Sequence, residues 1–107
     1  MDKFDRPFTV QIDRIVEEII PAFLKGKQED LVKMKSALDN GDYTSVEQIA
    51  HKIKGSSGSY GFNQLSELGK ELEFACKESD KEKVPELIEQ IGCYLKFVNI
   101  EYIDDME

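Results

Sequence analysis

The chain contains few of the residues that would indicate a metal site, a disulfide framework or a membrane anchor. Its 107 residues include two cysteines, three prolines and one histidine. Cys76 and Cys93 lie 17 residues apart without a CxxC motif, so neither a disulfide scaffold nor a zinc site is expected. The longest apolar stretch, residues 19–24, is interrupted by Pro21 and is too short to span a bilayer. Residues 1–7 lack the apolar core of a signal peptide, and we therefore expect a cytoplasmic protein.

Basic residues are scarce relative to acidic ones. The chain has 14 Lys and Arg against 22 Asp and Glu, which gives a net charge of −8. Nucleic acids and anionic membrane surfaces both select basic partners, so the charge excludes both classes of ligand. The length and the hydrophobic content of 40% suit one core. We expect residues 1–107 to form a single monomeric domain.

Apolar residues recur with a helical period almost throughout, and no run has the alternation and composition that would predict a strand. The helical stripes run over residues 7–19, from Pro21 to Asn40, from residues 42–45 to Tyr60, from Phe62 to Cys76 and from Val84 to Tyr102. The predicted fold is all-α. It is an up-down antiparallel four-helix bundle over about residues 20–104, with the short N-terminal helix packed across one end.

The single histidine, His51, lies in the most informative part of the chain, the run from Ala50 to Gly61. At about 100° per residue, it points roughly 150° away from the centre of the apolar face of its helix. Gly55 and Gly58 follow on the same outward side, and Lys54 lies about 60° round from the histidine. Glycine inside a helix is less favourable than alanine by about 0.5–1 kcal/mol, so these glycines indicate a surface kept bare for a partner protein. The apolar face consists of Val46, Ile49, Ala50, Ile53, Ser57 and Tyr60.

Acidic side chains are absent from residues 48–66, whereas Lys52 and Lys54 are present. This distribution predicts a locally positive surface around His51, which suits a phosphoryl group or an acidic partner site better than a metal ion. The alternative is an ordinary solvent-exposed histidine. The glycines, the lysine three residues on and the missing carboxylates favour the first interpretation.

One motif and its downstream spacing carry a family resemblance. The residues are His51-x-x-Lys54-Gly55, then Gly61, Leu65, Leu72 and Glu73. Together with the stretch over residues 20–24, they make the sequence similar to the histidine-containing phosphotransfer (HPt) family over about residues 15–100. The resemblance implies that His51 Nε2 accepts a phosphoryl group from an aspartyl phosphate on a response-regulator receiver domain, or from a histidine kinase. It then passes the group to a receiver aspartate, so the protein is a phosphocarrier and not an enzyme.

The resemblance also implies roles for residues around the histidine. Lys54 would offset the charge of the phosphoryl group, and the magnesium ion would belong to the receiver, so this chain needs no cofactor. Family members often place Glu or Gln 22 residues beyond the histidine, here Glu73, where a carboxylate on Nδ1 fixes the ring tautomer. The alternatives are that Glu73 is an ordinary surface residue, or that Glu47, one turn before His51, competes for Nδ1. Lys70 lies where some relatives carry a second polar residue near the ring, and its alternative is a solvated lysine.

Docking to a receiver needs apolar contacts as well as charge. Relatives use the N-terminal region for this, and we expect an exposed apolar patch beside the histidine. Its candidates are Val10, Ile12, Val16 and Ile19, of which Val16 and Ile19 are the expected contacts. The rest of the expected binding surface consists of Lys52, Gly55, Gly58 and Lys70.

The alternative function is a non-phosphorylated module with the same fold that binds a receiver or a kinase. Such a module would be free to lose its phosphoacceptor. The joint presence of His51, Lys54 and Gly55 therefore favours the phosphocarrier.

Overall fold

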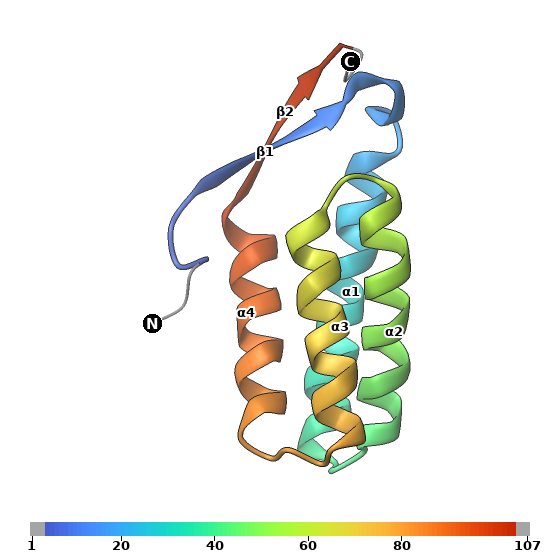
Figure 1. Ribbon diagram of the computed structural model, residues 1–107, viewed down its shortest axis with the longest axis vertical. Coiled ribbons are helices and arrows are strands. Elements are labelled where there is room, and N and C mark those ends of the chain that lie inside the picture. Colours follow the sequence, from blue (N-terminus) through green and yellow to red (C-terminus); the bar gives the residue numbers. More distant parts are fainter. Residues whose placement is uncertain (1–3, 105–107) are drawn as a thin grey trace.

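Four helices packed side by side form the body of the protein (Figure 1). The computed structural model describes residues 4–104. The helices are α1 (Ile20–Asp39), α2 (Tyr43–Ser59), α3 (Asn63–Lys77) and α4 (Lys83–Phe97). Both α1 and α3 pack against α2 and α4, so the four helices surround one core, and consecutive helices run in opposite directions in Figure 1. The prediction of a mostly helical fold with four long helices is confirmed.

The helix ends follow from local chemistry. Pro21 lies in the first turn of α1, where its missing N–H group is not needed. After α1 the backbone turns at Gly41, whose φ of +68° is a conformation that glycine adopts without strain. The Asp42 side chain then accepts a hydrogen bond from the Ser45 N–H at 3.1 Å and caps the start of α2. Gly61, with a φ of +96°, provides the turn between α2 and α3.

The N-terminal segment is a strand and not the predicted helix. Strand β1 (Phe8–Asp13) pairs in parallel with β2 (Val98–Ile103), with Phe8 opposite Val98 and Asp13 opposite Ile103. A short 3₁₀-helix, η1 (Arg14–Val16), follows β1. The prediction of a helix over residues 7–19 was wrong, and so was the extension of the last helix to Tyr102.

The reason is that two periods fit the same apolar residues. In β1, Phe8, Val10 and Ile12 turn toward the protein while Thr9 and Gln11 are exposed, which is the alternation of a strand. The wider spacing of apolar residues up to residue 19 also fits a helical stripe, so the pattern alone does not distinguish the two. The segment forms a strand because its backbone pairs with β2, about 90 residues later in the chain.

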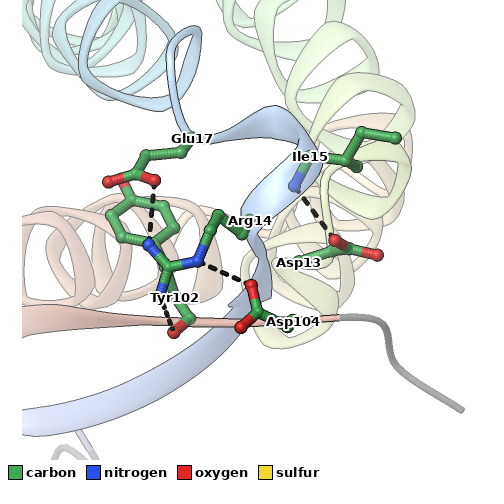
Figure 2. A network of polar contacts seen from close by, with 6 residues as sticks. All are labelled: Asp13, Arg14, Ile15, Glu17, Tyr102 and Asp104. Atoms are coloured by element: carbon green, nitrogen blue, oxygen red, sulfur yellow. Dashed lines mark hydrogen bonds and ion pairs between the residues drawn. The ribbon is translucent and has the colours of Figure 1, made fainter.

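Arg14 ties the ends of the two strands together (Figure 2). Its guanidinium donates from Nε to Asp104 Oδ1 at 2.8 Å and from Nη2 to the carbonyl oxygen of Tyr102 at 3.2 Å. It also donates from Nη1 to Glu17 Oε1 at 3.2 Å. This network connects the segment before the bundle to the segment after it.

Neither Cys76 nor Cys93 forms a disulfide within residues 4–104. Cys76 is buried in α3, and burial raises the pKa of its thiol to about 11, so it stays uncharged and unreactive at neutral pH. Within residues 4–104, no helix is long and apolar enough to cross a membrane. The same part of the chain contains no group of three or more His, Cys, Asp or Glu side chains arranged to hold a metal ion.

Candidate functional site

His51 lies near the middle of α2 and points away from the core. Its side chain is 67% exposed, whereas Ala50 and Ile53 on the same helix are fully buried. The amphipathic spacing of α2 explains this direction, because residues three and four apart share one face of a helix. Of the predicted core face, Val46, Ala50, Ile53 and Ser57 are buried, and Ile49 and Tyr60 are half-buried.

A glycine sets the distance between α2 and α3 at this point. A Cβ atom added to Gly69 would lie 2.8 Å from the backbone nitrogen of Lys54 and 3.0 Å from the carbonyl oxygen of Ala50. The two helices therefore touch backbone to backbone beside the turn that carries His51. Glu73, one turn after Gly69 on the same face of α3, is placed opposite the histidine. Gly69 was not among the predicted site residues, although a glycine inside a strongly amphipathic helix is a signal of close packing.

We expect Gly69→Ala to destabilise the protein by about 1–3 kcal/mol, because backbone atoms cannot turn aside and the helices must move apart. Gly26→Ala in α1 is the matched control, since nothing lies within 4 Å of the position of its Cβ. Alanine there should stabilise the protein by about 0.5–1 kcal/mol through helix propensity alone. Urea unfolding followed by circular dichroism measures both changes. Equal stabilities of the two variants would contradict the backbone contact.

Glu73 joins the histidine to a lysine. Its Oε2 lies 2.8 Å from His51 Nδ1, and its Oε1 lies 2.9 Å from Lys54 Nζ. The Glu73 side chain is only 12% exposed, in contrast to the exposed imidazole. The pKa of the Glu73 carboxyl is lowered, chiefly by the hydrogen bond from Lys54; burial opposes this, and the hydrogen bond from His51 adds to it. Glu73 is therefore an ionised carboxylate at neutral pH.

The ionised carboxylate determines which ring nitrogen carries the proton. A carboxylate can only accept hydrogen bonds, so Nδ1 of a neutral His51 is the protonated nitrogen and donates to Glu73. The lone pair then lies on Nε2, which has no hydrogen-bond partner among residues 4–104. An imidazole in this tautomer, on an exposed surface, is a nucleophile that another protein can reach.

Comparison with known proteins identifies the family of this chain. The family model of the Hpt domain matches residues 18–106. The chain belongs to the Hpt domain family. Hpt domains are phosphocarrier modules that interact with response regulators and histidine kinases. No curated protein and no solved structure gives a significant match. Strand β1 precedes the matched residues, and β2 lies within them.

The surface around the histidine of this Hpt domain is less positive than the sequence predicted, because a carboxylate from another helix approaches it. Lys52 Nζ lies 3.1 Å from Asp30 Oδ1, a carboxylate of α1 that is itself buried and also pairs with Lys27 at 3.2 Å. Asp30 thus comes next to a segment, residues 48–66, that has no acidic side chain of its own. Asp30 and Lys27 were not among the predicted site residues, because nothing in a helical pattern predicts a buried ion pair.

The lysines of this region outnumber the carboxylates with which they pair. Asp30 and Glu73 each pair with two lysines, so four ammonium groups pair with two carboxylates. Glu47, half-buried and one turn before His51, is a third carboxylate here and belongs to none of these pairs. The pairs are Lys27 and Lys52 with Asp30, and Lys54 and Lys77 with Glu73. Lys77 Nζ is the most distant of the four, at 3.8 Å from Glu73 Oε2, and Lys77 was not among the predicted site residues.

The remaining predicted polar residues lie at different distances from this arrangement. Gly55 is exposed, and nothing lies within 4 Å of where its Cβ would be. Gly58 is also exposed but faces α3, since its Cβ would lie 3.4 Å from Ser66 Oγ. Lys70 is exposed and lines a groove of about 720 Å³ that Lys54 and Glu73 also border. Glu47, the alternative partner of Nδ1, is half-buried, and Glu73 makes the hydrogen bond to Nδ1.

The four apolar candidates of the N-terminal region differ in exposure. Ile12 is buried, Val10 and Val16 are half-buried, and Ile19 is 45% exposed. Ile15, in η1, is 86% exposed. The exposed apolar residues of this region are therefore Ile15 and Ile19, where the chain enters α1.

The lowered pKa of Glu73 predicts a pH-dependent contribution to stability. A carboxyl group whose pKa is lower in the folded than in the unfolded state stabilises the fold fully above its ordinary value of 4.5. This contribution is lost as the pH falls through the lowered pKa. We expect the unfolding free energy of His51→Gln to exceed that of His51→Gln/Glu73→Gln by a constant amount near neutral pH. This difference should shrink as the pH falls below 4.5. The His51→Gln background removes the titration of the ring itself.

Urea unfolding at a series of pH values measures this difference. Glu71→Gln in the same background serves as the surface control, because Glu71 is exposed and has no ion pair within residues 4–104. A Glu73 difference that is the same at all pH values would contradict the assignment of the lowered pKa to the lysine pair.

Proposed function

We propose that this Hpt domain is a histidine phosphotransfer protein of a two-component phosphorelay. His51 Nε2 accepts a phosphoryl group from a receiver aspartyl phosphate, or from a histidine kinase, and passes it to a response-regulator aspartate. The observation that supports this most directly is the exposed imidazole whose Nδ1 is held by Glu73 at 2.8 Å while Nε2 faces outward. An imidazole used only for packing would need neither the exposure nor the oriented carboxylate.

The transfer step uses the tautomer that Glu73 holds. The Nε2 lone pair attacks phosphorus, and the N–P bond forms as the bond from phosphorus to the aspartate oxygen breaks. The Nδ1 proton stays on the ring, which becomes a cation, and the ionised Glu73 carboxylate 2.8 Å away balances that charge. No proton has to leave the site, so the reverse step toward a second receiver is equally accessible.

Lys54 is the residue that we propose to offset the phosphoryl charge. It lies one turn after His51, and its side chain is 37% exposed, so its ammonium can turn from Glu73 toward a group on Nε2. The receiver supplies the magnesium ion and most of the transition-state stabilisation. The protein is then a carrier without catalysis or a cofactor of its own.

We propose that a receiver docks over the outward face of α2. Gly55 leaves open space beside the histidine, and the exposed Ile15 and Ile19, with the half-buried Val16, offer apolar contacts where α1 begins. We propose a monomeric, cytoplasmic protein that meets its partners one at a time.

The test is intact-mass analysis of the full chain after incubation with a small phosphoramidate and with a panel of phosphorylated receiver domains. The expected result is one added phosphoryl group that is lost in acid and that fragmentation places on His51. Receiver binding without any phosphoryl uptake would overturn the carrier and would favour the non-phosphorylated binding module.

A further inference from the structure

Glu73 has a second lysine within reach. Lys77 Nζ lies 3.8 Å from Glu73 Oε2, beyond hydrogen-bond distance but inside the range of an ion pair. Lys77 follows Glu73 by one turn in the last turn of α3, with the glutamate on the N-terminal side, which is the favourable order for such a pair. In the present arrangement Lys54 and His51 hold the carboxylate, and Lys77 is not among the causes of its lowered pKa.

The proposed transfer would draw Lys54 away from the Glu73 carboxylate, and Lys77 is placed to pair with this carboxylate instead. If Lys54 turns toward the phosphoryl group, the Glu73 carboxylate loses its closest cation, at 2.9 Å. This carboxylate is only 12% exposed, and a poorly solvated carboxylate without a cation is costly. It would take up a proton or move toward water, and in either case it would no longer hold the Nδ1 proton of His51.

We propose that Lys77 is a positioning residue that replaces Lys54 on Glu73 when Lys54 turns to the phosphoryl group. This inference rests on the proposed function and adds to it a lysine exchange at a fixed carboxylate. Glu73 stays ionised throughout and keeps the ring in one orientation, so the carboxylate never depends on a single lysine.

The geometry leaves room for the exchange. The Lys77 side chain is 57% exposed, and it borders the same groove of about 720 Å³ as Lys54 and Glu73. A shift of the ammonium by about 1 Å along this open surface gives hydrogen-bond distance. Lys70 borders the groove too, one turn before Glu73, but it is not among the ion-pair partners of Glu73 within residues 4–104. Lys70 is therefore a matched control of equal charge on the same helix.

The first test needs no phosphorylation. Side-chain ¹³C NMR would follow the titration of Glu73 in the full chain, in single variants and in pairs of variants with Lys54→Met. The charged groups that face Glu73 are His51 and Lys54 from α2 and Lys77 from α3. His51 is present in every variant, so its contribution cancels in the comparison.

We expect Lys77→Met alone to leave the Glu73 pKa unchanged, because Lys54 is in place. In Lys54→Met the pKa should stay below 4.5, since Lys77 moves in. Lys54→Met/Lys77→Met should raise it by about one pH unit above Lys54→Met, while Lys54→Met/Lys70→Met, with the same net charge, should not. An effect of Lys77→Met that is equal with and without Lys54, or equal effects of the two double variants, would overturn the exchange.

The second test measures the lifetime of the phosphorylated protein by intact mass. Lys77→Met should shorten the lifetime several-fold, and Lys77→Arg should restore it. Lys83→Met, at the start of α4 and on the same groove, should match the wild type. If the wild type takes up no phosphoryl group, the proposed function fails while the titration still decides the exchange. If it takes up the group, and Lys77→Met behaves as Lys70→Met in the titration and as Lys83→Met in the lifetime, only the exchange is overturned.

Discussion

A His51→Gln variant is expected to take up no phosphoryl group from any donor that modifies the wild-type protein. The amide of glutamine fits the space of the ring and can still donate a hydrogen bond to Glu73, but its nitrogen has no nucleophilic lone pair. Because the His51 side chain is 67% exposed, the unfolding free energy should change by less than about 0.5 kcal/mol. The substitution therefore separates the chemistry from the fold. Intact mass and urea unfolding measure the two quantities on the same sample.

Lys54→Gln is the control that shows whether an altered charge beside His51 is enough to abolish phosphoryl uptake. It keeps the nucleophile and removes the cation closest to Glu73, so we expect slower uptake but not its complete loss. Receiver affinity, measured by calorimetry, should remain in His51→Gln, because the imidazole supplies the chemistry and the surrounding surface supplies the contacts. An acid-labile phosphoryl group on His51→Gln would show that another residue accepts it.

The direction of His51 could be predicted from the sequence, because helical geometry is local. Once Val46, Ala50 and Ile53 are assigned to the core, the turn of about 100° per residue leaves the histidine little freedom to face elsewhere. The start of α1 and the turn between α1 and α2 could be predicted for the same reason, because Pro21 and Gly41 act through their own backbones. The position of Glu73 came from the family spacing, which encodes a packing distance between two helices that the residues themselves do not reveal.

Contacts between segments far apart in the chain could not be predicted in this way. The strand character of β1 depends on β2, which lies about 90 residues later, and β1 alone fits two periods. The absence of acidic residues over 48–66 suggested an unopposed positive surface, yet Asp30 from α1 and Glu73 from α3 approach it in space. A charge pattern along one helix says nothing about the charges that neighbouring helices bring to it.

Asp30 is the residue of this surface for which the largest loss of stability is expected. Its side chain is 5% exposed and pairs with Lys27 at 3.2 Å and with Lys52 at 3.1 Å. Lys27 is 8% exposed, and its ammonium also lies 5.3 Å from the ring centre of Phe23. Asp30→Asn keeps the shape but leaves the buried ammonium of Lys27 without a counter-ion. Removing one member of a buried pair destabilises a protein by about 3–5 kcal/mol, and we expect a value in this range at neutral pH.

Two further variants distinguish a buried pair from a surface one. Lys52→Met removes the partner that is 58% exposed, and it should destabilise by no more than about 1 kcal/mol. Lys27→Met added to Asp30→Asn removes the stranded charge, and it should restore most of the loss, because apolar groups often replace a buried ion pair without destabilisation. Urea unfolding of the four proteins, wild type included, gives these values. An equal loss of unfolding free energy in Lys52→Met and Asp30→Asn would contradict this interpretation. The stabilising pair would then be the exposed Asp30–Lys52 pair beside His51, and not the buried Asp30–Lys27 pair.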